Sequence, residues 1–188
     1  SGYKRRVEAV QSKPKVVSDL LDHALNKGIL ADYVLMDSWF TQAPLIQSIT
    51  DKGLDVIGMV KQLKQRYQYD GGRFTLPELY RKAKPAMGKK DILGAIHVTL
   101  DNGIPAKIVF IRNRHKRSEW LAILSTDTTL DNEEIVRIYG MRWDIEVFFK
   151  CNKSLLNLEM EFQGRSYDTL ILKIIIDKNN AQRFKLLP

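Results

Sequence analysis

Four side chains that could handle phosphate and metal recur at helical spacing late in the chain: Tyr139, Arg142, Glu146 and Lys153. On a helix of ~100° per residue they fall within about 60° of one another. A carboxylate between two cations suits a site where the acid holds a metal ion and the cations hold phosphates. The same pattern is typical of a solvated helix face, in which Arg142 and Glu146 form an ordinary i,i+4 pair.

A second candidate acid, Asp37, follows the apolar run Tyr33–Met36. Such a run predicts a strand buried on both faces. Open α/β sheets hold their ligands at the carboxyl ends of the strands, so Asp37 is a candidate metal ligand. The alternative is that Asp37 only caps the next turn. Trp39 and Trp143 stand beside the two acids and could support them by packing.

The elements around Asp37 predict an α/β unit. A helix is expected over residues 18–28 with Ser18 as its cap, and a second over residues 43–52 closed by Gly53. Another buried strand fits residues 54–60. Strand, helix and strand with short connections predict a parallel pair.

The middle of the chain is expected to be rich in β-structure. Residues 61–90 are strongly basic and lack a long periodic stretch, whereas residues 92–100 and 104–111 flank Asp101-Asn102-Gly103, a strong hairpin signal. A further strand is expected over residues 120–124, and a helix from Asp131 to about Leu158. The expected regions are a partial core (1–60), a β-rich insertion (61–128) and a core helix with a tail (129–188).

The charge of the chain points to a polyanionic partner. Its 188 residues carry a formal net charge of +8, which favours nucleic acid, although a merely basic soluble protein fits too. One dense basic loop between two expected strands could follow a DNA backbone or only be solvated: Arg112, Arg114, Lys116 and Arg117. Four aromatic residues of the basic section could grip DNA strands or belong to the core: Tyr67, Tyr69, Phe74 and Tyr80.

Several classes of protein and site are disfavoured. A single cysteine, Cys151, excludes an internal disulfide and a cysteine-rich zinc site. No apolar run reaches the ~18 residues that span a bilayer, and the first residues lack the apolar segment of a secretory signal. A cytoplasmic protein is therefore expected.

The spacing Tyr139-x2-Arg142-x3-Glu146-x6-Lys153 resembles the signature of the insertion-sequence-four group of DDE transposases. The runs 33–40 and 120–127 resemble the same family. The resemblance implies a ribonuclease-H-like core interrupted by the β-rich insertion. It also implies metal-dependent cleavage and strand transfer at transposon ends by the parent protein.

The resemblance assigns roles to the candidate residues. Asp37 and Glu146 would be the second and last acids of the catalytic triad and ligands of Mg²⁺ or Mn²⁺. Tyr139, Arg142 and Lys153 would bind DNA, with help from the basic loop. The partners would be transposon-end and target DNA and further copies of the protein, in a bacterial cytoplasm at the nucleoid.

The first acid of the triad has no clear counterpart. Residues 1–17 contain no apolar strand that ends in Asp, and the spacing after Asp19 favours a helix cap or first turn there. We therefore expect this chain to lack the first acid and to be inactive alone. Two rival functions remain open: another two-metal nuclease of the same fold, and a non-enzymatic DNA-binding remnant.

Overall fold

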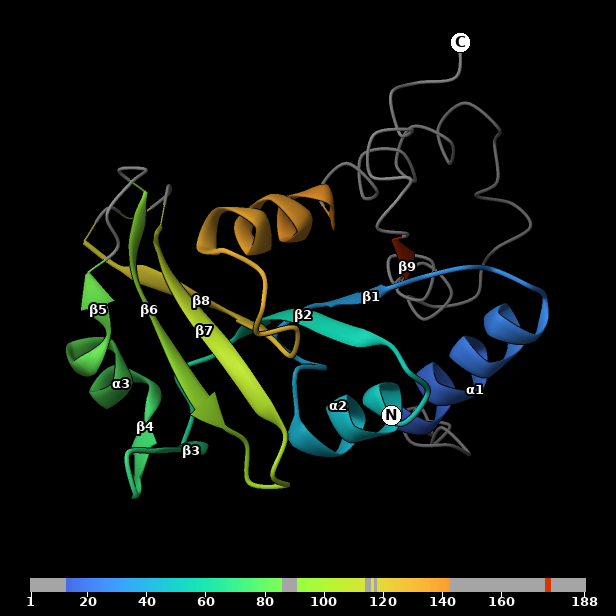
Figure 1. Ribbon diagram of the computed structural model, residues 1–188, viewed down its shortest axis with the longest axis horizontal. Coiled ribbons are helices and arrows are strands. Elements are labelled where there is room, and N and C mark those ends of the chain that lie inside the picture. Colours follow the sequence, from blue (N-terminus) through green and yellow to red (C-terminus); the bar gives the residue numbers. More distant parts are fainter. Residues whose placement is uncertain (1–12, 86–90, 114–115, 117, 143–174, 177–188) are drawn as a thin grey trace, which may run out of the picture.

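The computed structural model describes residues 13–85, 91–113, 116, 118–142 and 175–176, which form a mixed α/β arrangement (Figure 1). Its helices are α1 (Lys13–Asn26), α2 (Ala43–Thr50) and α3 (Leu76–Lys82), and residues 132–142 are also helical. The strands are β1 (Tyr33–Met36), β2 (Asp55–Val60), β3 (Arg66–Tyr69), β4 (Gly72–Thr75), β5 (Lys84–Pro85), β6 (Ile92–Thr99), β7 (Pro105–Arg112), β8 (Trp120–Ser125) and β9 (Ile175–Ile176). Among the described helices, none is long and apolar enough to cross a membrane.

All the described strands join one sheet in the order β4-β3-β6-β7-β8-β2-β1-β9, with β5 paired to β6. Strands β1 and β2 are parallel, which confirms the predicted unit, and Met36 stands opposite Gly58. Strand β8 pairs antiparallel with β2, with Ala122 opposite Val60. The section 61–128 therefore continues the sheet that holds β1 and β2. That this section is an insertion into the core stays a prediction.

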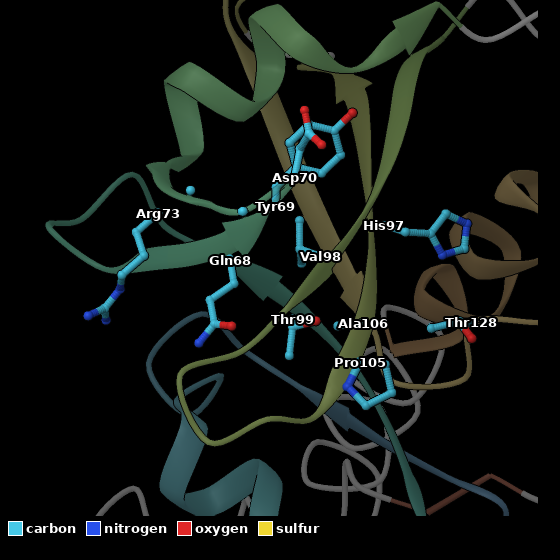
Figure 2. A pocket seen from close by; sticks show the side chains of 12 residues that line it. Gln68, Tyr69, Asp70, Arg73, His97, Val98, Thr99, Pro105, Ala106 and Thr128 are labelled. Carbon is cyan, nitrogen blue, oxygen red and sulfur yellow. The ribbon is translucent and has the colours of Figure 1, made fainter.

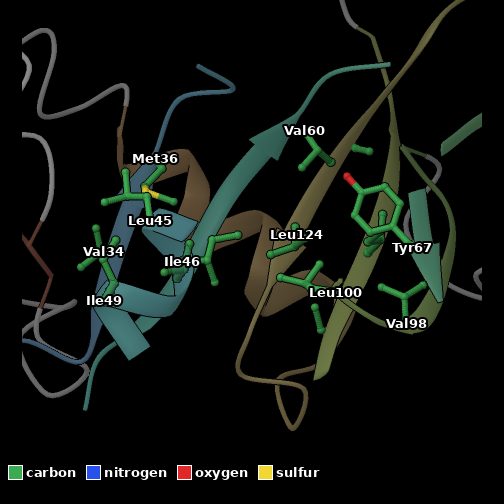
Figure 3. Packing of buried hydrophobic residues seen from close by; sticks show 14 of the residues in the cluster. Val34, Met36, Leu45, Ile46, Ile49, Val60, Tyr67, Val98, Leu100 and Leu124 are labelled. Carbon is green, nitrogen blue, oxygen red and sulfur yellow. The ribbon is translucent and has the colours of Figure 1, made fainter. Parts of the chain in front are cut away.

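One side of the sheet, which we call the three-helix face, is covered by α1, α2 and α3 (Figure 1). Alternate strand residues point to it, including Val34 and Met36 of β1, and pack on Leu45, Ile46 and Ile49 of α2 (Figure 3). The cluster continues over β7 and β8 to α3. This face holds the larger of the two cores.

The other side, the single-helix face, is covered by helical residues 132–142 (Figure 1). Tyr33 and Leu35 of β1 point to it and pack with Ile135 and Ile138 of that helix. Strand β1 is thus buried on both faces, as its continuous apolar run predicts.

Two helices differ from the sequence expectation. Helix α1 begins at Lys13, so Ser18 is no cap. The helix extends before Ser18 because Val17 is already part of its buried face. Ser18 therefore lies inside the helix, and its hydroxyl is 3.1 Å from that of Ser48 in α2. Helix α3 was not expected. Its seven residues are too few to show a period, although Thr75 and Glu78 form a capping box at its start.

The hairpins show how local turn chemistry sets the register. The predicted turn between β6 and β7 is confirmed, with Gly103 at φ 85°. A second hairpin joins β3 to β4 through Asp70 and Gly71, at φ 47° and 73°. Positive φ at both central residues belongs to the tight turn that Asp-Gly favours.

The four aromatic residues of the basic section 61–90 belong mainly to the core. Tyr67 is buried, and Tyr69, Phe74 and Tyr80 pack beside it or against its cluster. The Tyr67 hydroxyl has no hydrogen-bond partner among the described residues. Burial, with the nearby charge of Asp101, raises the pKa of Tyr67 to about 12. The side chain therefore stays neutral and acts as a packing group.

Candidate active site

Asp37 lies at the carboxyl edge of the parallel pair, directly after β1. Its turn is held tightly: the Ser38 hydroxyl and the Trp39 N–H donate to Asp37 Oδ1 at 2.8 and 3.2 Å. The Asp37 carbonyl accepts from the Thr41 N–H and hydroxyl at 3.2 and 3.0 Å. Asp37 thus anchors its turn, as the capping alternative expects, and its carboxylate is held in one orientation.

Gly58 in β2 makes room for this turn. A Cβ at Gly58 would lie 2.5 Å from Thr41 Oγ1 and 3.0 Å from its Cγ2. Real Cβ atoms do not approach other atoms so closely, so any side chain here would displace Thr41. Since Thr41 is buried and bonded to the Asp37 carbonyl, Gly58 sets the position of the acid.

Asp37 is an anion at neutral pH. Burial raises the pKa of its carboxyl, while hydrogen bonds from Ser38 and Trp39 lower it. The positive charges of Arg142 and Lys61 lower it further, and the pKa lies below its ordinary value. Arg142 belongs to the helical signature, so the fold brings the two sequence patterns together at this edge.

The helix that carries Arg142 begins as predicted. Asp131 caps it, because its Oδ1 accepts from the Glu134 N–H at 2.7 Å. The segment before it is tied to the sheet at two points. The Tyr33 hydroxyl donates to Asp127 Oδ2 at 2.8 Å, and Lys107 Nζ donates to the Leu130 carbonyl at 2.7 Å. These bonds fix the start of the helix, and apolar packing fixes its course.

Two of the four signature residues lie within the described helix. Tyr139 and Arg142 are 5% and 9% exposed, and the Arg142 guanidinium carbon lies 5.5 Å from the centre of the Tyr139 ring. The predicted polar stripe is therefore covered at this end, and Tyr139 packs with the apolar residues of the single-helix face. Glu146 and Lys153 lie outside the described residues, as does the expected helix end near Leu158.

The predicted basic loop joins β7 to β8 at the same sheet edge as Asp37, because β8 runs antiparallel to both β2 and β7. Arg112 closes β7, and exposed Lys116 lies 3.2 Å from a carboxylate oxygen of Glu119. Arg114 and Arg117 lie outside the described residues. Topology thus places this loop at the same edge of the sheet as the acid, although the two are distant in sequence.

Trp39 does not support Asp37 by packing, and the expectation of such a role is wrong. Its side chain is 72% exposed, and the Lys61 ammonium lies 4.1 Å from the centre of its ring. Strand β1 ends at Met36 and the turn that follows it is short, so the indole projects away from the core. The second tryptophan, Trp143, lies outside the described residues.

The opposite edge of the sheet holds an open hollow of about 500 Å³ (Figure 2). It is lined by the β3–β4 turn and by the facing ends of β6 and β7, with His97 and Thr128 at one side. It contains no residue of the Asp37 turn. This hollow is therefore separate from the candidate chemistry.

Among the residues that the structure describes, no three acids, histidines or cysteines come together as a metal site. Asp37 offers what a hard cation needs: an ionised, oriented carboxylate, whose hydrogen bonds from described residues both reach Oδ1. A second ligand must come from elsewhere, and Glu146 is the predicted one.

Curated proteins and solved structures say little about this chain. A search of curated proteins finds no significant match. A cryo-electron microscopy structure of the piggyBac transposase synaptic complex with hairpin DNA is 16% identical over 72% of this chain and 26% of that chain, with a TM-score of 0.39. This similarity is too low to assign a fold or an activity, and the match spans about a quarter of that protein.

The family model matches far more of the chain. The model described as the transposase DDE domain covers residues 7–176, a range that includes both Asp37 and the Tyr139–Lys153 signature. The chain belongs to the DDE transposase domain family.

Proposed function

We propose that this chain is the catalytic segment of a DDE transposase of the insertion-sequence-four group, whose whole protein cleaves transposon ends and joins them to target DNA. The observation that carries the proposal is the convergence of Asp37 and Arg142. They belong to two sequence patterns far apart in the chain, yet the charge of one lowers the pKa of the other. The match of the family model over residues 7–176 supports it.

Asp37 and Glu146 would hold the metal. The ionised Asp37 carboxylate suits Mg²⁺ or Mn²⁺, which prefer oxygen ligands. When bound, such ions supply activation of the attacking hydroxyl and stabilisation of the leaving oxygen. Gly58, Thr41 and the Ser38 hydroxyl would keep the carboxylate oriented for this task.

The cations would position the DNA. Arg142, whose charge lowers the pKa of Asp37, would bind an oxygen of the scissile phosphate, and Tyr139 would hold the guanidinium in place. Lys153 would contact phosphate further along the same helix. The loop between β7 and β8 would follow the flanking backbone, because it lies at the same sheet edge. Arg112, Arg114, Lys116 and Arg117 are its proposed contacts.

The fold that we propose is a ribonuclease-H-like core interrupted by the β-rich section 61–128, which acts within a multimeric protein–DNA assembly. The parallel pair with an acid at its carboxyl edge supports such a core. Asp19 lies exposed inside α1 and ends no strand, so it is no substitute for the first triad acid. We therefore propose that the 188-residue chain alone is inactive.

The test is cleavage and strand transfer by the full-length protein on DNA that carries the ends of its own element, with Mg²⁺. Asp37→Asn and Glu146→Gln should each abolish both reactions. Asp19→Asn is the matched control and should leave both unchanged, since Asp19 is an exposed acid on α1.

Three other outcomes would contradict parts of the proposal. Cleavage without strand transfer would indicate another two-metal nuclease. Salt-sensitive DNA binding without cleavage, indifferent to Mg²⁺ and to Glu146→Gln, would indicate a DNA-binding remnant. Metal-dependent nicking by the 188-residue chain, abolished by Glu146→Ala, would show that the chain alone is active.

A further inference from the structure

The side chain of Trp39 is exposed to solvent, which is unusual for a tryptophan. It is 72% exposed, although a tryptophan side chain gains more than most from burial. The other large apolar side chains that the described surface exposes are aliphatic: Ile29, Leu30 and Leu63. Trp39 is therefore the one exposed aromatic among the described large apolar residues, and it lies two residues after the candidate acid.

The backbone of Trp39 is held in place while its ring is not buried. Its N–H donates to Asp37 Oδ1 at 3.2 Å, and its carbonyl accepts from Gln42 Nε2 at 3.2 Å. The position of the indole is thus tied to the carboxylate itself. An exposed ring on a fixed backbone loses little conformational entropy when a ligand stacks on it.

The surroundings of the ring are cationic. The Lys61 ammonium lies over one face of the ring, 4.1 Å from its centre, which leaves the opposite face for stacking, and the charge of Lys61 also acts on Asp37. Lys61 is itself exposed, as is Lys64 in the same loop. A flat aromatic surface beside cations is the arrangement that binds single-stranded nucleic acid, whose bases stack while its phosphates pair with charge.

We propose that Trp39 and Lys61 form a stacking platform for an unpaired DNA base next to the scissile phosphate. The proposal rests on the proposed function and adds a substrate feature to it: DNA whose strands are separated at the cut. Trp39 follows Asp37 by two residues and its N–H donates to the Asp37 carboxylate, so a nucleotide whose phosphate lies at Asp37 would bring its base to the indole. Lys61 would bind the neighbouring phosphate.

The test measures binding of the 188-residue chain to a fluorescent oligothymidylate and to a duplex of equal length, by anisotropy in EDTA. Trp39→Ala should weaken binding to the single strand by about 5- to 150-fold, the range found for loss of one stacked base. Duplex binding should change by less than about twofold, because paired bases cannot stack on the ring. Trp39→Phe should keep most of the affinity.

Two further variants separate stacking from charge and from general exposure. Lys61→Gln should reduce the salt dependence of single-strand binding by about 0.7 in the slope of log K against log salt, the amount expected for one phosphate. Leu30→Ala is the matched control. Leu30 is 79% exposed and precedes β1, at the opposite end of the strand from Asp37, so its loss should change neither affinity.

The outcomes separate the platform from the function on which it rests. Equal single-strand affinity of Trp39→Ala and the parent would overturn the platform and leave the transposase proposal standing. Equal weakening of single-strand and duplex binding would also overturn it, since stacking on an unpaired base would then not be the cause. Failure of the parent chain to bind either DNA would count against both proposals.

Discussion

The two faces of the sheet divide stability and chemistry between them. The three-helix face is built from α1, α2 and α3, two of which flank β1 closely in sequence, and it holds the larger core. The single-helix face depends on residues 132–142, which bring Arg142 to Asp37. A change on the first face should mainly alter the free energy of unfolding. A change on the second should also alter the electrostatics of the acid.

The largest expected effect is that of Phe110→Ala on the three-helix face. Phe110 is fully buried, and its ring centre lies 5.2 Å from those of both Tyr80 and Trp120. Its loss should lower the free energy of unfolding by about 3–5 kcal/mol, measured by urea denaturation. Leu63→Ala, at an exposed site, should change it by less than about 0.5 kcal/mol. A similar small loss for Phe110→Ala would contradict the division of roles.

On the single-helix face, Ile138→Ala should lower the free energy of unfolding less than Phe110→Ala does, but it should also change the pKa of Asp37. Ile138 is 3% exposed in the smaller cluster, and its truncation should lower the free energy of unfolding by about 2–3 kcal/mol. Because Arg142 follows one turn later, its charge should move and the pKa of Asp37 should rise. Carbon NMR titration of the Asp37 carboxyl measures this. An unchanged pKa would mean that Arg142 is held independently of the helix packing.

Gly58→Ala tests the point where the three-helix face meets the site. The new Cβ would displace Thr41, and we expect a loss of about 1–3 kcal/mol in the free energy of unfolding. Gly140→Ala is the control, because a Cβ there meets nothing within 4 Å. In a helix interior that substitution should stabilise by about 0.5–1 kcal/mol. Denaturation curves that shift in the same direction for both variants would refute the steric explanation.

Tyr67→Phe, unlike the other substitutions on the three-helix face, should raise the free energy of unfolding. The Tyr67 hydroxyl is buried without a hydrogen-bond partner among the described residues, and leaving such a group unsatisfied costs free energy. Its removal should raise the free energy of unfolding by about 1 kcal/mol. Destabilisation measured in the same urea assay would indicate that the hydroxyl has a partner after all.

Lys61→Gln should have the smallest effect on the free energy of unfolding, because it removes only an exposed charge. Lys61 is exposed, so the free energy of unfolding at neutral pH should change by less than about 0.5 kcal/mol. The pKa of Asp37 is lowered in the folded state, so its contribution to stability is present above the ordinary value and is lost as the pH falls through the folded value. Removal of the Lys61 charge should raise that pKa and move the loss to higher pH. An NMR titration without this upward shift would exclude Lys61 as a cause.

Elements that follow from a local rule are predictable from the sequence. The run Tyr33–Met36 predicts a buried strand, Asp101-Asn102-Gly103 predicts a hairpin, and Asp131 predicts a helix cap; each is confirmed. The signals for α3 and for the β3–β4 turn were also present, in the Thr75–Glu78 capping box and in Asp70-Gly71. Both elements are too short to show a hydrophobic period, so these signals alone do not predict them.

What could not be predicted depends on contacts between distant segments. Hydrophobic periodicity does not say which strand pairs with which, so the antiparallel pairing of β8 with β2 was not foreseen. The exposure of Trp39 and the burial of Tyr139 follow from where the chain turns and what covers the helix. The candidate acid was therefore predictable from its strand, whereas the action of Lys61 on it was not.

The pairing of β2 with β8 also constrains how the molecule folds. During synthesis, β1 and β2 leave the ribosome long before β8. The side of β2 that pairs with β8 therefore stays unpaired until β8 has been made. Contacts that close such long loops slow folding. We expect the hairpin of β6 and β7 to form early and the edge that carries Asp37 to assemble late. The exposed side of β2 would then be a site of aggregation in chains interrupted before β8.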